Sequence, residues 1–306
     1  MATLDGFRMA VVGASSGIGR SLGIQAARSG ASVAFAARRL DLLEGAVEEA
    51  GGQSFAIACD ARSDEQCARV VEETVTRFGG LDAIVYATGR SPLVELADAD
   101  GDVWRQVIET NVVGAAMITR AALPHLEASS GRVLFLGSSS VGRPYPGLVA
   151  YTTSKAALHE FARGLRNEYP WLRVTTFIVG PTMSDFANEW DAEVAMAMFG
   201  RWTTEGYPMS SPMTVEDMAA QILRVLSSGA RVEEVLVMPD QPKPEVAPEP
   251  SAAAAAASAA WSEAAAAAAA AGAAVPGTDS AGTDSAGTDS AGTDSAGTIA
   301  STPAAD

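Results

Sequence analysis

The sequence contains few cysteines, few histidines and little basic charge. Cys59 and Cys67 are its only cysteines, which are too few for a disulfide framework and favour a reducing compartment. Two cysteines and two histidines also lack the spacing of a metal site, so we expect no bound metal. The N-terminal segment lacks the basic start, long apolar core and cleavage site of a secretory signal peptide.

The formal net charge is −16, because 37 acidic side chains stand against 21 basic ones. A protein that binds nucleic acid through its phosphates needs a basic face, so we expect no nucleic-acid partner. Only two of the basic residues are lysines, Lys155 and Lys243, and the rest are arginines. These features predict an acidic, soluble protein of the cytoplasm.

The composition changes sharply toward the C-terminus. Closely spaced prolines are followed by a run dominated by alanine and then by four copies of Gly-Thr-Asp-Ser-Ala over 277–296. The alanine run over 252–274 has no leucine, isoleucine or phenylalanine and includes Glu263, so insertion into a membrane would gain little. The repeats have almost nothing to bury. We therefore predict a folded domain over 1–240 and a disordered, low-complexity tail over 241–306.

The predicted domain alternates short apolar runs with longer segments of helical periodicity. The apolar runs lie at 9–13, 32–37, 54–59, 83–86, 133–137, 174–179 and 235–238. The helical segments lie at 18–28, 40–50, 64–78, 103–123, 152–169 and 215–227. Apolar strands separated by helices indicate a parallel sheet covered on both faces. The sequence therefore predicts an α/β fold, a single Rossmann-like doubly wound parallel sheet of about seven strands.

The first apolar run leads into a glycine-rich turn, Gly-Ala-Ser-Ser-Gly-Ile-Gly, at 13–19. Glycines at this point permit a tight turn and let the backbone approach a pyrophosphate at the N-terminus of the next helix. Such a turn can also merely connect a strand to a helix, but its place between the first strand and the first helix favours nucleotide binding. The cofactor-binding residues expected here are Gly13, Ser15, Ser16, Gly17, Ile18 and Gly19.

Two arginines, Arg38 and Arg39, follow the second apolar run. An NAD site usually carries an acid at this point, which accepts from the ribose 2′-hydroxyl, but no carboxylate occurs here until Asp41. Because a guanidinium binds phosphate as a charged fork, the pair favours NADP over NAD. The alternative is that both arginines form only the solvated start of a helix.

The most specific pattern is Tyr151-Thr-Thr-Ser-Lys155, thirteen residues after Ser138. Tyrosine and lysine four residues apart share one face of a helix. A nearby ammonium stabilises a phenolate and is expected to lower the pKa of Tyr151. Tyr151 would then serve as a general acid for a carbonyl oxygen or as a base for an alcohol. Lys155 is the only lysine before the predicted tail, which strengthens the pattern.

In these motifs and their order, residues 1–240 resemble the short-chain dehydrogenase/reductase family. Asn111 resembles the asparagine of the family's catalytic tetrad, and Ser138, Tyr151 and Lys155 match its other members by type and spacing. The resemblance implies that Tyr151 transfers a proton while Ser138 holds the substrate oxygen. It also implies that Lys155 binds the nicotinamide ribose and that Asn111 supports a water in a proton relay.

The resemblance implies further cofactor contacts and an assembly. Asp60 resembles the aspartate that contacts adenine, and the segment 179–184 resembles the one that holds the nicotinamide carboxamide. The cofactor residues expected beyond the glycine turn are Arg38, Arg39, Asp60, Ala61, Ala87, Gly89, Tyr151, Lys155, Thr182 and Ser184. A homodimer or homotetramer is expected, as is common in the family.

The sequence departs from the family pattern at three places. Val12 replaces a threonine, Tyr-Ala-Thr-Gly at 86–89 replaces Asn-Asn-Ala-Gly, and Val179 replaces a proline. The first two concern the link between neighbouring strands beside the adenosine half of the cofactor. Ser139 and Ser140 follow Ser138 directly, so a register slip would exchange the catalytic serine.

The segment between Ser184 and Thr214, here called the lid, covers the substrate in this family. It is rich in aromatic and methionine side chains, namely Phe186, Trp190, Met196, Met198, Phe199, Trp202, Tyr207 and Met209. These side chains either pack the lid onto the domain or face the cleft, where they would suit an apolar carbonyl or alcohol. Arg201 is the lid's only cation that could bind a carboxylate. His125 and His159 are interpreted as structural or surface residues.

The predicted function is therefore NAD(P)-dependent oxidoreduction, in which an alcohol and a ketone or aldehyde are interconverted by hydride transfer. One alternative is a sensor or scaffold that binds NADP without catalysis, although such proteins normally lose the tyrosine or the lysine. Another alternative is an epimerase or dehydratase on the same fold, but the substrate region is too short for a sugar-binding domain.

Overall fold

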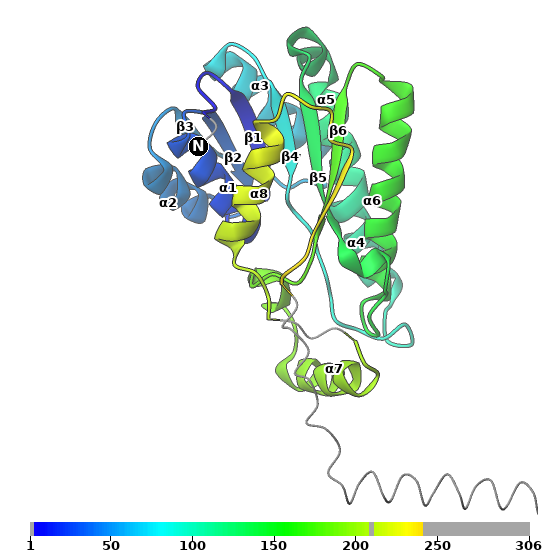
Figure 1. Ribbon diagram of the computed structural model, residues 1–306. Coiled ribbons are helices and arrows are strands. Elements are labelled where there is room, and N and C mark those ends of the chain that lie inside the picture. Colours follow the sequence, from blue (N-terminus) through cyan, green and yellow to red (C-terminus); the bar gives the residue numbers. More distant parts are fainter. Residues whose placement is uncertain (1–2, 208–210, 241–306) are drawn as a thin grey trace, which may run out of the picture. The chain divides into compact units, whose positions relative to one another are not determined.

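The computed structural model describes residues 3–207 and 211–240 (Figure 1). Its centre is a seven-stranded sheet in the order β3-β2-β1-β4-β5-β6-β7, and all neighbouring strands are parallel. The strands are β1 (Arg8–Val12), β2 (Ser32–Ala37), β3 (Ser54–Ala58), β4 (Ala83–Tyr86), β5 (Arg132–Ser138), β6 (Arg173–Val179) and β7 (Glu234–Val237). The predicted α/β sheet is confirmed, whereas the predicted tail over 241–306 lies outside the described residues.

The central strands are buried on both faces. Every residue of β2 and β4 is buried, and so are all residues of β1 except the first. Strands covered on both sides read as continuous apolar runs, which is why the sequence predicts them well. The edge strand β7 instead alternates exposed and partly buried residues.

Helices cover the sheet on both faces (Figure 1). Side chains of α3 (Asp64–Phe78), α5 (Gly114–Ser129) and α6 (Val149–Glu168) share one buried cluster with one face of the strands. Side chains of α1 (Gly17–Arg28), α2 (Leu40–Ala50) and α8 (Val215–Leu226) form the other cluster with the opposite face. The described domain is therefore a three-layer sandwich, which places the loops at the strand ends on its rim.

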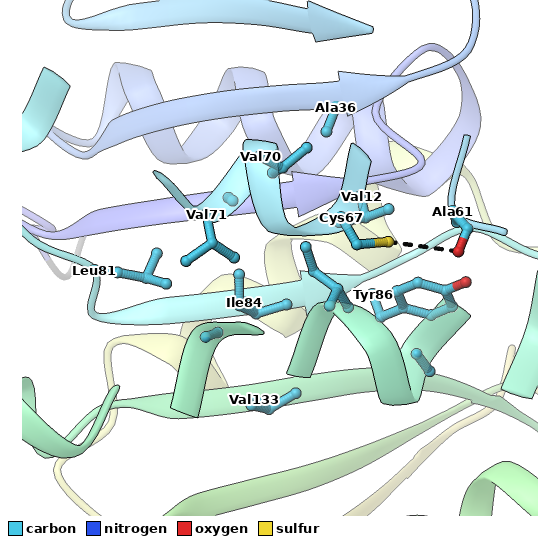
Figure 2. Packing of buried hydrophobic residues seen from close by; sticks show 14 of the residues in the cluster. Val12, Ala36, Ala61, Cys67, Val70, Val71, Leu81, Ile84, Tyr86 and Val133 are labelled. Atoms are coloured by element: carbon cyan, nitrogen blue, oxygen red, sulfur yellow. Dashed lines mark hydrogen bonds between the residues drawn. The ribbon is translucent and has the colours of Figure 1, made fainter. Parts of the chain in front are cut away.

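Figure 2 shows part of the first cluster, where Cys67 of α3 packs near Tyr86 of β4 and Val12 of β1. The Cys67 thiol donates to the main-chain oxygen of Ala61 at 3.5 Å. Cys59 and Cys67 are both free and buried.

The single helix predicted over 103–123 is wrong. The structure has α4 (Gly101–Ile108), one π-helical turn (Glu109–Val113) and then α5, which continues through Pro124. A π-helical turn inserts one residue into the helical repeat, and apolar periodicity does not reveal such a single insertion. The inserted turn contains Asn111, whose side chain is fully buried.

The lid includes a short 3₁₀ turn (Asp185–Ala187) and the helix α7 (Ala192–Thr204), which the sequence analysis did not separate. α7 begins at an Asp191 cap, whose carboxylate accepts from the amides of Glu193 and Val194 at 2.9 and 3.1 Å. Among the described residues, no helix is both long enough and apolar enough to cross a bilayer.

Candidate active site

The predicted site residues gather at the carboxyl edge of the sheet. The glycine turn follows β1, Arg38 and Arg39 follow β2, and the other segments follow β3, β4 and β6 in the same way. Ser138 is the last residue of β5. The carboxyl ends of parallel strands meet at one edge, and the strand order reverses between β1 and β4, where doubly wound sheets bind their ligands.

Tyr151 lies in the first turn of α6 and is 8% exposed. The Phe186 ring of the lid stands edge-on to the Tyr151 ring, with 5.1 Å between the centroids. Burial raises the pKa of Tyr151 to about 12, and a side-chain hydrogen bond with Ser138 acts in the opposite direction. The phenol therefore carries its proton at neutral pH and can donate it to an oxygen placed beside Ser138.

Lys155 lies one helical turn beyond Tyr151 and is 4% exposed. Its ammonium donates to the main-chain oxygen of Leu136 at 2.7 Å and lies 5.8 Å from the centre of the Tyr151 ring. Burial lowers the pKa of Lys155 to about 8. The expectation that Lys155 lowers the pKa of Tyr151 is wrong for this arrangement, because burial of the phenol dominates and the ammonium is bound to Leu136.

The three consecutive serines have different surroundings. Ser138 has the side-chain hydrogen bond to Tyr151, and its Oγ lies 2.9 Å from the Oγ of Ser140. The Thr152 hydroxyl donates to Ser140 at 3.3 Å, while Ser139 is only partly buried. Of the three hydroxyls, that of Ser138 is therefore the one beside the phenol, as the thirteen-residue spacing predicts.

Asn111 connects the helix that carries Tyr151 with the loop after β4. Its amide nitrogen donates to the Arg90 main-chain oxygen at 2.9 Å and to the Ser154 hydroxyl at 2.8 Å. Its amide oxygen accepts from the Arg90 main-chain nitrogen at 2.7 Å. Ser154 in turn donates to the main-chain oxygen of Tyr151 at 2.6 Å. Both amide protons of Asn111 are thus used for positioning these segments.

His159 is a site residue that the sequence analysis missed. The Ser138 main-chain nitrogen donates to His159 Nε2 at 3.4 Å, so the imidazole contacts the last residue of β5. The signal was available in the spacing, because Tyr151, Lys155 and His159 follow one another every four residues along one face of α6. His125 lies on α5 and is partly buried.

The glycine turn has the geometry that a dinucleotide pyrophosphate requires. α1 begins at Gly17, which has a φ of +56°, and Ser16 makes no side-chain cap to the helix. The amides of the first turn, at Ile18 and Gly19, therefore keep free donors for an anion. A Cβ on Gly13 would lie 2.7 Å from the Thr88 Cα, so the close approach of the segment after β4 requires glycine.

The two arginines after β2 behave differently. Arg39 donates to the hydroxyls of Ser15 and Ser16 at 3.0 and 3.1 Å, which ties it to the glycine turn. Within residues 3–207 and 211–240, the Arg38 guanidinium makes no hydrogen bond or ion pair. Its positive charge still contributes to lowering the pKa of Asp60. Among the described residues, the Arg38 guanidinium is therefore free to bind a 2′-phosphate.

Asp60 is paired within its own loop. Arg62 binds its carboxylate with two nitrogens, the shorter contact being 2.6 Å, and this hydrogen bonding is the main reason that the pKa of Asp60 is lowered. The Asp60 main-chain nitrogen donates to Gln66 at 2.8 Å. If Asp60 contacts adenine as predicted, its carboxylate would do so while it is also bonded to Arg62. The neighbouring Ala61 is buried.

The remaining predicted cofactor residues lie around the same edge. A Cβ built on Gly89 would be 3.5 Å from the Lys155 ammonium, so glycine keeps the space beside that ammonium open. A Cβ on Gly17 would lie 3.6 Å from Ser184 Cβ, which brings the segment after β6 to the glycine turn. Thr182 donates to the Gly180 main-chain oxygen at 3.0 Å, and Ala87 packs in the second core cluster.

The departures from the family pattern leave the link between strands intact. The Ala87 nitrogen donates to the Val12 oxygen at 2.8 Å, so main-chain atoms connect β1 and β4 without the usual threonine hydroxyl. Tyr86 is fully buried, and its hydroxyl donates to the main-chain oxygen of Thr110, just before Asn111. The tyrosine thus connects β4 to the π-helical turn.

Most of the lid's described aromatic side chains pack onto the domain. Trp202 is 4% exposed and shares a cluster with Tyr151 and Leu148, against which Trp190 and other lid residues pack. The Trp190 indole donates to the Ser91 oxygen at 2.6 Å, and the Ser91 hydroxyl donates to the lid at the Phe186 oxygen. Met196 is 76% exposed, and Met209 lies outside the described residues.

The described part of the lid offers no free cation to a carboxylate substrate. Arg201 forms ion pairs with Glu95 and Glu205, each at 2.7 Å, so the cation of the described part of the lid is already occupied. No group of histidine, cysteine and acidic side chains in the described chain could hold a metal ion. The site therefore presents a phenol, hydroxyls and an ammonium beneath aromatic rings.

Comparisons with known proteins identify the family of the chain. The family model described as short chain dehydrogenase matches residues 8–195. The chain is 38% identical to 11-beta-hydroxysteroid dehydrogenase A of Sesamum indicum over 166 residues, which are 52% of this chain and 47% of that enzyme. The match thus spans about half the length of that relative. An uncharacterized oxidoreductase of Staphylococcus aureus is 30% identical over 179 residues, which are 58% of this chain and 78% of that protein.

A solved structure shows the same fold. An alcohol dehydrogenase from the archaeon Thermococcus sibiricus, complexed with 5-hydroxy-NADP, superposes with a TM-score of 0.66 at 23% sequence identity. The similarity covers 78% of this chain and 98% of the archaeal chain.

Proposed function

Because the chain belongs to the short chain dehydrogenase family, we propose that it interconverts an alcohol and a ketone or aldehyde with NADP as the cofactor. The observation that carries the proposal is the protonated phenol of Tyr151 beside the Ser138 hydroxyl, with the Lys155 ammonium one helical turn away. A buried acid next to a second hydroxyl is the arrangement that proton transfer to a carbonyl oxygen needs.

Each polar group has a distinct task in this reaction. The bound nicotinamide would supply the hydride for reduction or accept it for oxidation. During reduction, Tyr151 Oη donates its proton to the carbonyl oxygen, and the Ser138 hydroxyl orients that oxygen by a hydrogen bond. Alcohol oxidation is the reverse reaction: it begins from the Tyr151 phenolate, which takes up the hydroxyl proton of the alcohol while the hydride passes to the oxidised nicotinamide. Asn111 holds the helix of Tyr151 in register with the loop after β4.

The groups at the adenosine half support NADP. The uncapped first turn of α1 and the glycines at 13, 17 and 19 would hold the pyrophosphate. Arg38, which has no partner among the described residues, would bind the 2′-phosphate, while Arg39 fixes the serines of the turn. The archaeal dehydrogenase with the similar fold holds an NADP derivative, which is consistent with this choice.

The side chains of the lid favour an apolar substrate. Phe186 and Trp190 continue an aromatic path outward from Tyr151, with ring centroids 5.1 and 5.3 Å apart at successive steps. The only arginine of the lid's described part is paired with two glutamates, so a substrate carboxylate would meet no free cation there. The sesame relative is named a hydroxysteroid dehydrogenase, which agrees with a bulky apolar alcohol or ketone. Assembly into a homodimer or homotetramer is part of the same proposal.

A panel of ketones, aldehydes and secondary alcohols tests the function directly. The purified protein is incubated with each compound and with NADPH or NADP, and separately with NADH or NAD, while the nicotinamide absorbance is followed. We expect turnover of apolar carbonyl compounds with NADPH. Tight cofactor binding without turnover of any compound would contradict the enzyme proposal and favour a cofactor-binding sensor.

A further inference from the structure

We propose that His159 is a positioning residue that holds Ser138 in its working position and makes turnover depend on the protonation of the imidazole. This inference rests on the proposed function, because it assigns a role within the same site. The imidazole lies one turn beyond Lys155 on α6, and its Nε2 accepts from the Ser138 main-chain nitrogen at 3.4 Å. Ser138 is also the residue whose hydroxyl binds Tyr151.

Gly137 provides independent evidence that the imidazole is seated against this strand. A Cβ on Gly137 would overlap His159 Nε2 and lie 3.0 Å from the Cδ2 of the same ring. On its other side this Cβ would lie 3.2 Å from Thr176. β5 therefore has a glycine where the ring approaches, and the ring reaches the main chain of Ser138 only because that side chain is missing.

The surroundings keep the imidazole neutral. Burial and the positive charges of Lys155, Arg163 and Arg166 lower the pKa of His159, while Glu234 of β7 acts in the opposite direction. A neutral imidazole carries one proton, and because Nε2 accepts from Ser138, that proton belongs on Nδ1. The lone pair on Nε2 is then available to the Ser138 amide.

Protonation would turn this contact from attractive to repulsive. An imidazolium carries protons on both nitrogens, so Nε2–H would face the N–H of Ser138 and two donors would oppose each other. Ser138 would have to shift, and its hydroxyl would move relative to Tyr151. We expect a loss of kcat at acidic pH. Cofactor affinity should change little, because the imidazole contacts the main chain of Ser138 and is not among the predicted cofactor residues.

Two substitutions separate positioning from packing. In His159→Gln the amide oxygen can accept from Ser138 at every pH, so we expect near-normal kcat at neutral pH and loss of the acidic decline. In His159→Leu the ring is replaced by an apolar side chain that cannot accept, so kcat should fall about tenfold across the whole pH range. His125→Gln is the matched control, and its pH profile should follow that of the unchanged protein.

The measurements are kcat and KM against pH, NADPH affinity by fluorescence, and the pH dependence of the Ser138 amide resonance by NMR. The resonance should titrate with the imidazole in the unchanged protein and become flat in His159→Gln, whether or not a substrate has been found. An identical acidic decline in His159→Gln, or a Ser138 resonance that ignores the imidazole, would overturn the positioning role. Absence of turnover in the unchanged protein, with the resonance behaving as expected, would instead reject the proposed function alone.

Discussion

The ring of Phe186 stands edge-on to the ring of Tyr151, with 5.1 Å between their centroids. The lid therefore covers the group that is expected to move the proton, and burial raises the pKa of that phenol to about 12. Burial of the Lys155 ammonium lowers its pKa to about 8. The site thus holds a neutral phenol and an ammonium that is charged at neutral pH.

The ionisation of Tyr151 can be observed in the free protein. Because its pKa lies at about 12, the phenol should remain protonated at a pH at which an ordinary tyrosine, with a pKa of about 10, is half ionised. The difference in tyrosinate absorbance between the unchanged protein and Tyr151→Phe measures this residue alone. We expect that difference to develop above about pH 11, and a difference already complete at lower pH would contradict the burial of the phenol.

The cofactor preference depends on Arg38 more than on Arg39. Arg38→Ala should weaken NADPH binding by about ten- to a hundredfold and leave NADH binding nearly unchanged, since a charge-assisted contact to the 2′-phosphate is lost. Arg39→Ala should weaken both cofactors, because Arg39 is bonded to the serines of the glycine turn. Dissociation constants measured by nicotinamide fluorescence check both statements. Equal affinities for NADPH and NADH in the unchanged protein would refute the preference.

The sequence predicted most of the sheet because its strands are buried on both faces. Continuous apolar runs give strong signals, and the carboxyl ends of parallel strands then bring Ser138, Tyr151 and Lys155 to one edge. The π-helical turn at Asn111 could not be predicted, because one extra residue shifts the phase of the apolar periodicity only once within a long helical segment.

Two features of the site depend on contacts between distant segments. Tyr151 is buried partly by the Phe186 and Trp202 rings of the lid, and no local sequence pattern reveals that packing. The contact between His159 and Ser138 joins residues 21 positions apart, and it depends on the missing side chain of Gly137. The four-residue spacing after Lys155 shows which face His159 occupies, but it does not show what that face touches.

The hydrogen bond between Trp190 and Ser91 should contribute to substrate affinity. Trp190→Phe keeps an aromatic ring in the lid but removes the donor that reaches the Ser91 oxygen at 2.6 Å. We expect KM for apolar substrates to rise about two- to tenfold, while NADPH affinity stays constant. Met196→Gln is the control, because that side chain is 76% exposed, and it should leave KM unchanged. An unchanged KM in Trp190→Phe would mean that the hydrogen bond between Trp190 and Ser91 has no part in substrate binding.

The predicted domain boundary can be tested by truncation. Removal of residues 241–306 takes away mainly alanine and Gly-Thr-Asp-Ser-Ala repeats, so Tm should change by no more than about 1 °C. Truncation after Glu233 removes β7, which pairs with β6 over four residues, and should lower Tm by more than about 10 °C. Thermal melts of the full chain and of the two truncated proteins test both statements. A large decrease in Tm on removal of 241–306 alone would show that the domain boundary is wrong.

The proposed reaction depends most on Tyr151, the residue that moves the proton. Tyr151→Phe removes only the phenolic oxygen, so the ring should remain packed against Phe186 and NADPH affinity should stay within about twofold. Loss of a positioned general acid predicts a decrease in kcat of about a hundred- to ten-thousandfold. The most direct test is therefore the single-turnover rate of Tyr151→Phe, saturated with NADPH and with the best substrate of the panel. A rate reduced at least a hundredfold with cofactor binding intact is the predicted result, and a rate close to that of the unchanged protein would contradict the mechanism.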